Sequence, residues 1–180
     1  MKTRKNFAGL INERNYTVAV EIGVGHGGYS QYLLSECPKI ILYSIDPFIN
    51  CEEFREGAEK NSREKLTPFG ERSKLIIARG IDTAPTFEDN SIDFIYIDGE
   101  HTEKAVTEDL NAWWPKLKTG GIMAGHDYNI GGISKAVNEF TAAKSLAIQL
   151  TGTELVYDTP YGEECMQPSW WFEVSPITSE

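Results

Sequence analysis

Short apolar runs alternate with segments of helical spacing along most of the chain. A short apolar run bounded by turn residues is typical of a buried strand, and apolar residues three and four positions apart are typical of a helix. Strands are predicted at residues 18–22, 40–45, 75–78, 92–97 and 122–124. Helices are predicted at residues 7–15, 28–37, 51–66, 102–117 and 133–143. This alternation favours an α/β sheet over a barrel or a bundle.

The rest of the chain completes the predicted sheet. Residues 79–83 are predicted to form a loop after the third strand, and two late extended segments, 146–157 and 170–174, have no long helix between them. The fold class predicted is therefore α/β, a Rossmann-like doubly wound sheet of about seven strands, mostly parallel with an antiparallel C-terminal strand. Without a repeat or a low-complexity linker, residues 1–180 are expected to form a single domain.

Composition narrows the class of protein. The 27 acidic and 17 basic residues give a net charge of −10, and no dense Lys/Arg cluster occurs, which disfavours nucleic acid as a partner. No apolar run approaches the ~20 residues of a membrane span, and none follows the basic start to make a signal peptide. Cys37, Cys51 and Cys165 are too scattered for a disulfide framework or a paired zinc motif. We expect a cytoplasmic protein that binds neither membrane nor nucleic acid.

A glycine-rich loop follows the first strand and opens a helix. Gly23, Gly25 and Gly28 satisfy a dinucleotide-binding pattern, with Asp46 about 20 residues further on, so the spacing alone does not separate NAD from S-adenosylmethionine (SAM). Glu21, two residues before the first glycine, favours SAM over NAD as the ligand. A carboxylate there faces the ligand's amino-acid end or orients the loop, whereas a pyrophosphate gains nothing from an adjacent negative charge.

Acidic residues also end the second, fourth and fifth strands, at Asp46, Asp98 and Asp127. Ligands of open α/β sheets lie outside the carboxyl ends of the strands, so these carboxylates are expected to converge on one crevice. With His126, Asp98 and Asp127 would offer ligands that suit Mg²⁺ or Mn²⁺. Because imidazole is a poor Mg²⁺ ligand, His126 either favours a softer metal or is not a direct ligand.

His101 lies three residues after Asp98, on the loop that leaves the fourth strand. An unperturbed histidine, with a pKa near ~6.5, can take a proton from a hydroxyl near neutral pH. We therefore expect His101 to be the general base, next to the metal without being a necessary ligand. The simpler alternatives are a loop residue before a helix cap for His101, and a hydrogen-bonded turn for His126-Asp127-Tyr128.

The motifs together resemble a known family. Glu-Ile-Gly-x-Gly-x-Gly at residues 21–27, with an acidic residue ending the second strand, resembles class I SAM-dependent methyltransferases. Asp98-Gly99-Glu100-His101, the segment 113–117 and Gly125-His126-Asp127-Tyr128 resemble the methyltransferase family 24 branch, which includes macrolide-sugar and cephalosporin-pathway O-methyltransferases. The resemblance covers residues 16–130.

The resemblance implies roles for individual residues. Glu21, Gly23 and Gly25 would line the methionine part of SAM, Asp46 would bind the ribose hydroxyls, and Ile81 and Asp82 would flank the adenine. His26 and Asp98, on the same ligand side, complete the expected cofactor-binding set. A magnesium ion held by carboxylates at the strand ends and a histidine base at position 101 are implied as well.

The function expected is metal-assisted transfer of a methyl group from SAM to a hydroxyl of a small polyhydroxylated molecule, such as a sugar or glycosylated metabolite. The rivals are a nicotinamide-dependent oxidoreductase and a non-catalytic SAM-binding protein. The chain has no obvious segment that would cover a bound substrate. A second copy in a homo-oligomer is one way to complete the substrate site. Trp113 and Trp114 are expected to pack between helix and sheet rather than to bind substrate.

Overall fold

A seven-stranded sheet forms the centre of the computed structural model, which describes residues 1–49, 57–152 and 167–174. The strand order is β3-β2-β1-β4-β5-β7-β6. The first five strands are parallel to one another, and β7 runs antiparallel to both β5 and β6. The strands are β1 (Val18–Ile22), β2 (Ile41–Ile45), β3 (Ser73–Ile76), β4 (Ile92–Ile97), β5 (Leu117–Gly125), β6 (Gln149–Leu150) and β7 (Trp170–Glu173). The predicted fold class is confirmed.

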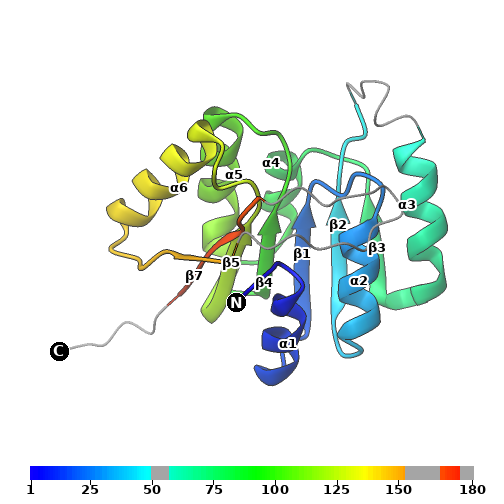
Figure 1. The fold of residues 1–180 in the computed structure, drawn as a ribbon. Helices are drawn as coiled ribbons and strands as arrows, with labels where there is room; N and C mark the ends of the chain where they lie inside the picture. Colours follow the sequence, from blue (N-terminus) through cyan, green and yellow to red (C-terminus); the bar gives the residue numbers. More distant parts are fainter. Residues whose placement is uncertain (50–56, 153–166, 175–180) are drawn as a thin grey trace.

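Helices cover both faces of this sheet (Figure 1). One apolar core lies between the sheet and α1, α2 and α3, and the other between the sheet and α5 and α6. The helices are α1 (Asn6–Glu13), α2 (Gly28–Glu36), α3 (Ala58–Leu66), α4 (Gly80–Thr83), α5 (Glu103–Trp113) and α6 (Gly131–Ala143). Because the sheet is covered on both sides, all six residues of β4 are buried, which explains why the strand is apolar apart from Asp93.

Helix α5 shows how local sequence sets an element that later frames the site. Thr102 caps it, because its Oγ1 accepts a hydrogen bond from the backbone N–H of Ala105. Val106, Leu110 and Trp113 are buried on one side, at helical spacing. Trp113 is fully buried and Trp114 packs against the same core, as predicted. The α-helix ends at Trp113, and a short 3₁₀ turn containing Pro115 follows it, because proline cannot continue the hydrogen-bond pattern.

The structure corrects three predicted boundaries. β3 is Ser73–Ile76 rather than 75–78, because its pairing with β2 starts at Ser73 and leaves Ile77 exposed at the sheet edge. The predicted loop 79–83 contains the short helix α4, too short to show a helical period. β5 is longer than 122–124: it starts at Leu117, which pairs with Ile92 across an irregularity in the register, and it ends at Gly125.

The predictions for the other elements hold to within a few residues where the structure describes them. β1 and β4 have the predicted bounds, and Trp170 and Phe172 are buried alternately along β7. The predicted helix 51–66 matches α3 from residue 58 on, and the predicted segment 146–157 contains β6. Residues 51–56 and 153–157 of these two predictions lie outside the described residues. Among the helices described, none combines the length and apolarity needed to cross a membrane.

One buried carboxylate ties the amino ends of the central strands together. Asp93 Oδ2, at the start of β4, accepts hydrogen bonds from the backbone N–H groups of Thr17 and Val18 at 2.9 Å each. Its Oδ1 pairs with Lys118 Nζ of β5 at 2.7 Å. Although burial opposes ionisation, these contacts hold the pKa of Asp93 below its usual range. The carboxylate thus fixes three neighbouring strands at one end of the sheet.

Replacing Asp93 with Ala is expected to lower the free energy of unfolding by about 2–4 kcal/mol, because two part-buried N–H groups and the Lys118 ammonium lose their acceptor. The matched change Asp89→Ala, which removes an exposed pair with Lys116, should cost at most about 1 kcal/mol. Urea unfolding measures both values.

The cost of Asp93→Ala should also depend on pH. A carboxyl whose folded pKa is depressed stabilises the protein above its unfolded pKa of about 3.9. That contribution should disappear as the pH falls through the lower folded value. An equal cost for both variants, or a cost for Asp93→Ala that is unchanged at acid pH, would contradict this role.

Candidate active site

The carboxyl ends of four parallel strands stand level with one another. Ile22 of β1 pairs with Ile45 of β2 and with Ile97 of β4, and Ile97 pairs with Gly125 of β5. Backbone hydrogen bonds continue one residue beyond the strands, from Asp98 N to Ile22 O at 2.7 Å and from His126 N to Ile97 O. The residues that follow these strands are therefore brought to one edge of the sheet, as the sequence predicted.

Gly23 lies at the closest approach between the ends of β1 and β4. Its φ is +88°, and a Cβ built there would lie 1.9 Å from the carbonyl oxygen of Asp98. A side chain would therefore force the two strand ends apart. Gly25 and Gly27 also have left-handed backbones, with φ of +52° and +74°, so the loop turns tightly before α2 begins at Gly28.

Asp46 organises this glycine loop. Its Oδ2 accepts hydrogen bonds from the N–H groups of Val24 at 2.8 Å and Gly25 at 2.9 Å, and its Oδ1 accepts one from Phe48 N at 2.8 Å. The side chain is nearly buried and lines the cavity described below. Two loop N–H groups that would otherwise be open to an anion thus already have an internal acceptor.

Glu21 is buried beneath the loop rather than exposed to a ligand. It is 1% exposed, and the Ser30 hydroxyl of α2 donates a hydrogen bond to it, with Ser44 of β2 2.9 Å from that hydroxyl. Burial raises the pKa of Glu21 to about 8. Of the two positions that the sequence left open for this carboxylate, the structure supports orientation of the loop.

A cavity of about 410 Å³ opens at the ends of β1, β2, β3 and β4, within the usual size range for a small-molecule site. The apolar side chains of its wall come from the ends of β1, β2 and β3 and from α5: Ile22, Ile45, Pro47, Ile49, Ile81 and Ala105. Glycines 23, 80 and 99 also line it, and the polar side chains on its wall are Asp46, Arg79, Glu100, His101, Glu108 and Asp109.

Some of the predicted cofactor-binding residues line this cavity and others do not. Gly23, Asp46 and Ile81 line it. His26 faces α3 instead, where Asn61 Nδ2 donates a hydrogen bond to its Nδ1 at 2.9 Å. Asp82 is exposed on α4 and is not among the described residues of the cavity wall.

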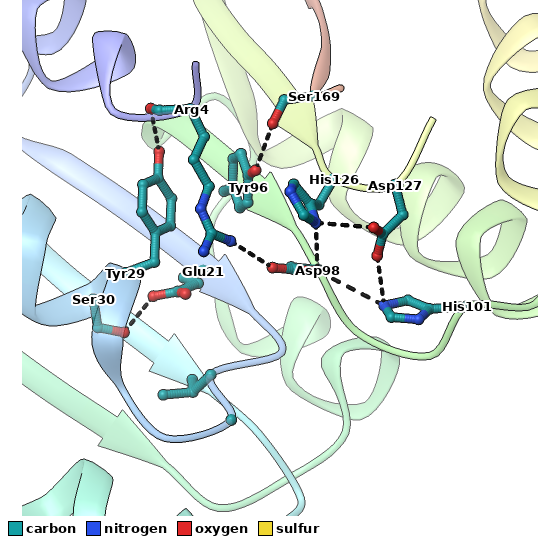
Figure 2. Close-up of polar contacts among 12 residues, drawn as sticks. Arg4, Glu21, Tyr29, Ser30, Tyr96, Asp98, His101, His126, Asp127 and Ser169 are labelled. Carbon is teal, nitrogen blue, oxygen red and sulfur yellow. Dashed lines mark hydrogen bonds and ion pairs between the residues drawn. The ribbon is translucent and has the colours of Figure 1, made fainter. Parts of the chain in front are cut away.

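Asp98, His101 and Asp127 form a compact cluster beside the cavity, with one potential ligand atom of each within 4.8 Å of the others. His101 Nε2 is 3.0 Å from Asp127 Oδ2 and 3.8 Å from Asp98 Oδ1. His126 Nδ1 reaches the same two carboxylates, at 3.0 Å from Asp127 and 3.8 Å from Asp98. Figure 2 shows both histidines directed at this carboxylate pair. The residue predicted to be the base and the residues predicted to be metal ligands thus lie together in one cluster.

The charges in this cluster compensate one another. The close contact with Asp127, and the more distant carboxylate of Asp98, raise the pKa of His101 to about 10. Although burial opposes its ionisation, hydrogen bonds from His101 and His126 hold the pKa of Asp127 below its usual range. His101 is therefore protonated at neutral pH while both carboxylates face it, which differs from the ordinary histidine assumed from the sequence.

Sequence reasoning missed two residues of the site, Arg4 and Asp109. Arg4 Nη1 is 3.2 Å from Asp98 Oδ2, and the guanidinium lies over the Tyr29 ring, 5.0 Å from its centroid (Figure 2). Nothing in the basic first residues distinguishes Arg4 from its neighbours. Asp109 of α5 is 8% exposed and lines the cavity. Its place three residues after Val106, on the apolar side of α5, was a readable signal.

Comparison with known proteins identifies a family. A family model described as a methyltransferase domain, that of methyltransferase family 24, matches residues 20–128, more than half of the 180 residues. A curated relative, the uncharacterized protein R132 of Acanthamoeba polyphaga mimivirus, is 28% identical over 120 residues, which cover 64% of this chain and 53% of that protein. The matched region thus spans only about half of that relative.

Solved structures share the fold. A Corynebacterium glutamicum protein has a TM-score of 0.70 at 13% identity, covering 98% of this chain and 80% of that one. The O-methyltransferase TomG from Streptomyces achromogenes, involved in tomaymycin synthesis and solved with SAM, has a TM-score of 0.69 at 14% identity, covering 96% and 79%. A SAM-dependent O-methyltransferase from Thermotoga maritima scores 0.69 at 15% identity, covering 98% and 66%. At these identities the likeness shows the fold alone.

The pairing of His101 predicts its titration in the metal-free protein. NMR of the imidazole C–H protons should give a pKa near 10, because ionised Asp127 and Asp98 stabilise the imidazolium. Asp127→Asn should bring the pKa closer to the ordinary value of about 6.5. Asp98→Asn should lower it less, because that carboxylate is 3.8 Å away rather than 3.0 Å. A titration that ignores both substitutions would contradict the pairing.

Proposed function

This chain belongs to methyltransferase family 24, and we propose that it transfers a methyl group from SAM to a hydroxyl oxygen of a small polyhydroxylated acceptor. One observation carries the proposal. The 410 Å³ cavity at the strand ends adjoins the cluster of Asp98, His101 and Asp127, and His101 lines both. A nucleoside-sized site thus lies beside groups that can handle a proton.

The cavity suits the adenosyl part of SAM. Its apolar wall fits a purine, and Gly23 allows close approach of a ligand to the backbone. Each carboxylate oxygen can accept two hydrogen bonds, so Asp46 Oδ1, which receives one from Phe48, keeps capacity for a ribose hydroxyl. Glu21 and Gly25 support this site through the loop, not from its wall.

The same contacts argue against the nicotinamide-dependent rival. A dinucleotide places its pyrophosphate on the N–H groups of the glycine loop. Here the N–H groups of Val24 and Gly25 donate to Asp46, whose carboxylate would also repel an approaching phosphate. An uncharged ribose is the better neighbour for this loop.

The carboxylate cluster fits a divalent cation. Two carboxylates and an imidazole within 4.8 Å supply hard oxygen donors and one nitrogen donor, which favours Mn²⁺ over Mg²⁺. Asp98, Asp127 and one of the two histidines would hold the ion. When bound, such an ion would acidify an acceptor hydroxyl.

The histidines give the cluster its proton chemistry. His101 holds a proton while its Nε2 faces ionised Asp127 and Asp98, so it accepts one from an acceptor hydroxyl only when that negative charge is neutralised. His126 is 13% exposed and lies against the same carboxylates, where it orients Asp127. Base catalysis by His101 is thus coupled to occupation of the cluster.

The proposal that the acceptor is a hydroxylated molecule rests on the family resemblance and on the ability of this cluster to take a proton from a hydroxyl group. O-methylation is what the names of TomG and of the Thermotoga maritima protein describe for those two proteins. A single domain, a homo-oligomer and a cytoplasmic location stay predictions. The alternative is that the protein binds SAM without catalysis. It predicts that no acceptor leads to formation of S-adenosylhomocysteine.

Calorimetry is expected to show micromolar binding of S-adenosylhomocysteine and none of NAD. Ala105→Trp should weaken this binding at least ~10-fold, because an indole on α5 fills the cavity. Thr107→Trp, exposed on the same helix, is the matched control and should bind normally. Tight binding of NAD, or equal binding by the two tryptophan variants, would contradict the assignment of this cavity.

The cation is tested directly with Mn²⁺, followed by loss of the free-ion EPR signal. We expect one tight site per chain, lost in Asp127→Asn and kept in the exposed control Asp82→Asn. EDTA should abolish methyl transfer, and Mn²⁺ should restore it. Methyl transfer that is complete in EDTA would exclude the metal-assisted scheme and leave cofactor binding untouched.

His101→Ala is expected to lower the methyl-transfer rate by ~10²–10⁴, the usual contribution of a positioned proton acceptor, with S-adenosylhomocysteine affinity unchanged. Steady-state assays of product formation against pH measure this loss. If the variant retains the native rate, His101 is not the base. If it loses Mn²⁺ binding as well, its main role is that of a ligand.

A further inference from the structure

A buried carboxyl on the cavity wall has no role in the chemistry above. Asp109 of α5 is 8% exposed, and within the described parts of the chain its side chain makes no hydrogen bond. Burying a carboxyl without a partner is costly, so such groups usually pair with something. An unpaired carboxyl on the wall of a ligand cavity points to a partner on the ligand.

The cavity of about 410 Å³ that Asp109 lines supplies the room for that partner, and the carboxyl packs against two glycines of its wall. A Cβ at Gly80 would lie 2.7 Å from Asp109 Oδ1, and one at Gly99 would lie 3.9 Å from Oδ2. A side chain at Gly80 would therefore collide with the carboxyl, whereas one at Gly99 would only touch it. Both glycines also approach Ile22 Cγ2, so the carboxyl lies at the rim of an apolar surface.

The charges around Asp109 do not supply a fixed partner. Arg79 attracts it, whereas Glu108 and Glu100 oppose its ionisation, and burial is the largest effect, raising the pKa of Asp109 to about 7. Arg79 is exposed, and no ion pair joins it to Asp109 within the described residues. The carboxyl accepts a hydrogen bond in either protonation state.

The structure of SAM leaves one hydrogen-bond donor as the candidate partner of the Asp109 carboxyl. The proposed function, on which this inference rests, sets the sulfonium toward Asp98 and His101 and the ribose hydroxyls toward Asp46. The remaining donor on the adenosyl part is the exocyclic 6-amino group of the purine. Gly80 and Ile81, in the turn after β3, and Ala105 of α5 border Asp109 and provide the apolar wall for that ring.

We propose that Asp109 recognises the 6-amino group of the adenine, accepting its N–H, and so selects adenosyl ligands over 6-oxopurine ligands. Above pH 7, where Asp109 is mostly ionised, a 6-oxo group, itself an acceptor, would face the carboxylate oxygen without a hydrogen between them. Asp109 is thus a specificity-determining residue, separate from the residues that handle the proton.

The test compares S-adenosylhomocysteine with S-inosylhomocysteine, which differs only at the purine 6-amidine edge. Calorimetry of the wild-type protein should show at least ~10-fold tighter binding of the adenosyl ligand, the value of one well-placed hydrogen bond. Asp109→Asn presents either an oxygen or an amide N–H to the ligand, so it should reduce this preference about tenfold, mainly by improving binding of the inosyl ligand.

The matched control is Glu108→Gln, which neutralises the adjacent carboxylate on the same cavity wall. It should keep the wild-type preference. Equal wild-type binding of both ligands, or an unchanged preference in Asp109→Asn, would overturn the inference while the proposed function stands. If the wild-type protein binds neither ligand, the proposed function fails, and this inference fails with it.

Discussion

The parallel register of β2, β1, β4 and β5 is the constraint on which the site depends. It brings four strand ends level, and the contact of Gly23 with the carbonyl of Asp98 keeps the two central ends together. Since only a residue without a side chain fits there, the positions of the loop and of Asp98 are set jointly. The cavity and the carboxylate cluster are then two consequences of one backbone arrangement.

Carboxylates support this arrangement from within. Asp46 holds the glycine loop through backbone N–H groups, and buried Glu21 holds the start of α2 through Ser30. Asp93 performs a similar task at the opposite ends of the strands. Their common effect is a rigid loop whose donors are already satisfied, which suits an uncharged nucleoside better than a pyrophosphate. In the proposed function, the carboxylates of Asp98 and Asp127 are the ones that face the reacting group.

The sequence predicted most of the fold and the convergence of strand ends, because buried parallel strands such as β4 are mostly apolar and are followed by an acidic residue. It misplaced β3, whose edge position lets pairing with β2 decide its bounds, and it missed α4, which is too short for periodicity. Asp109 could have been found from its helical spacing. Arg4 could not, because its contact with Asp98 joins residues far apart in the sequence. The raised pKa of His101 depends on distances to two carboxylates that spacing does not give.

The most direct test of the account is a crystal structure with S-adenosylhomocysteine and Mn²⁺. The account predicts the purine against Ile81 and Ala105, the ribose at Asp46, the ligand sulfur facing Asp98, and the ion between Asp98 and Asp127. The hydrogen bonds from Val24 and Gly25 to Asp46 should remain intact. A ligand bound outside this cavity, or loop N–H groups turned from Asp46 to the ligand, would contradict it.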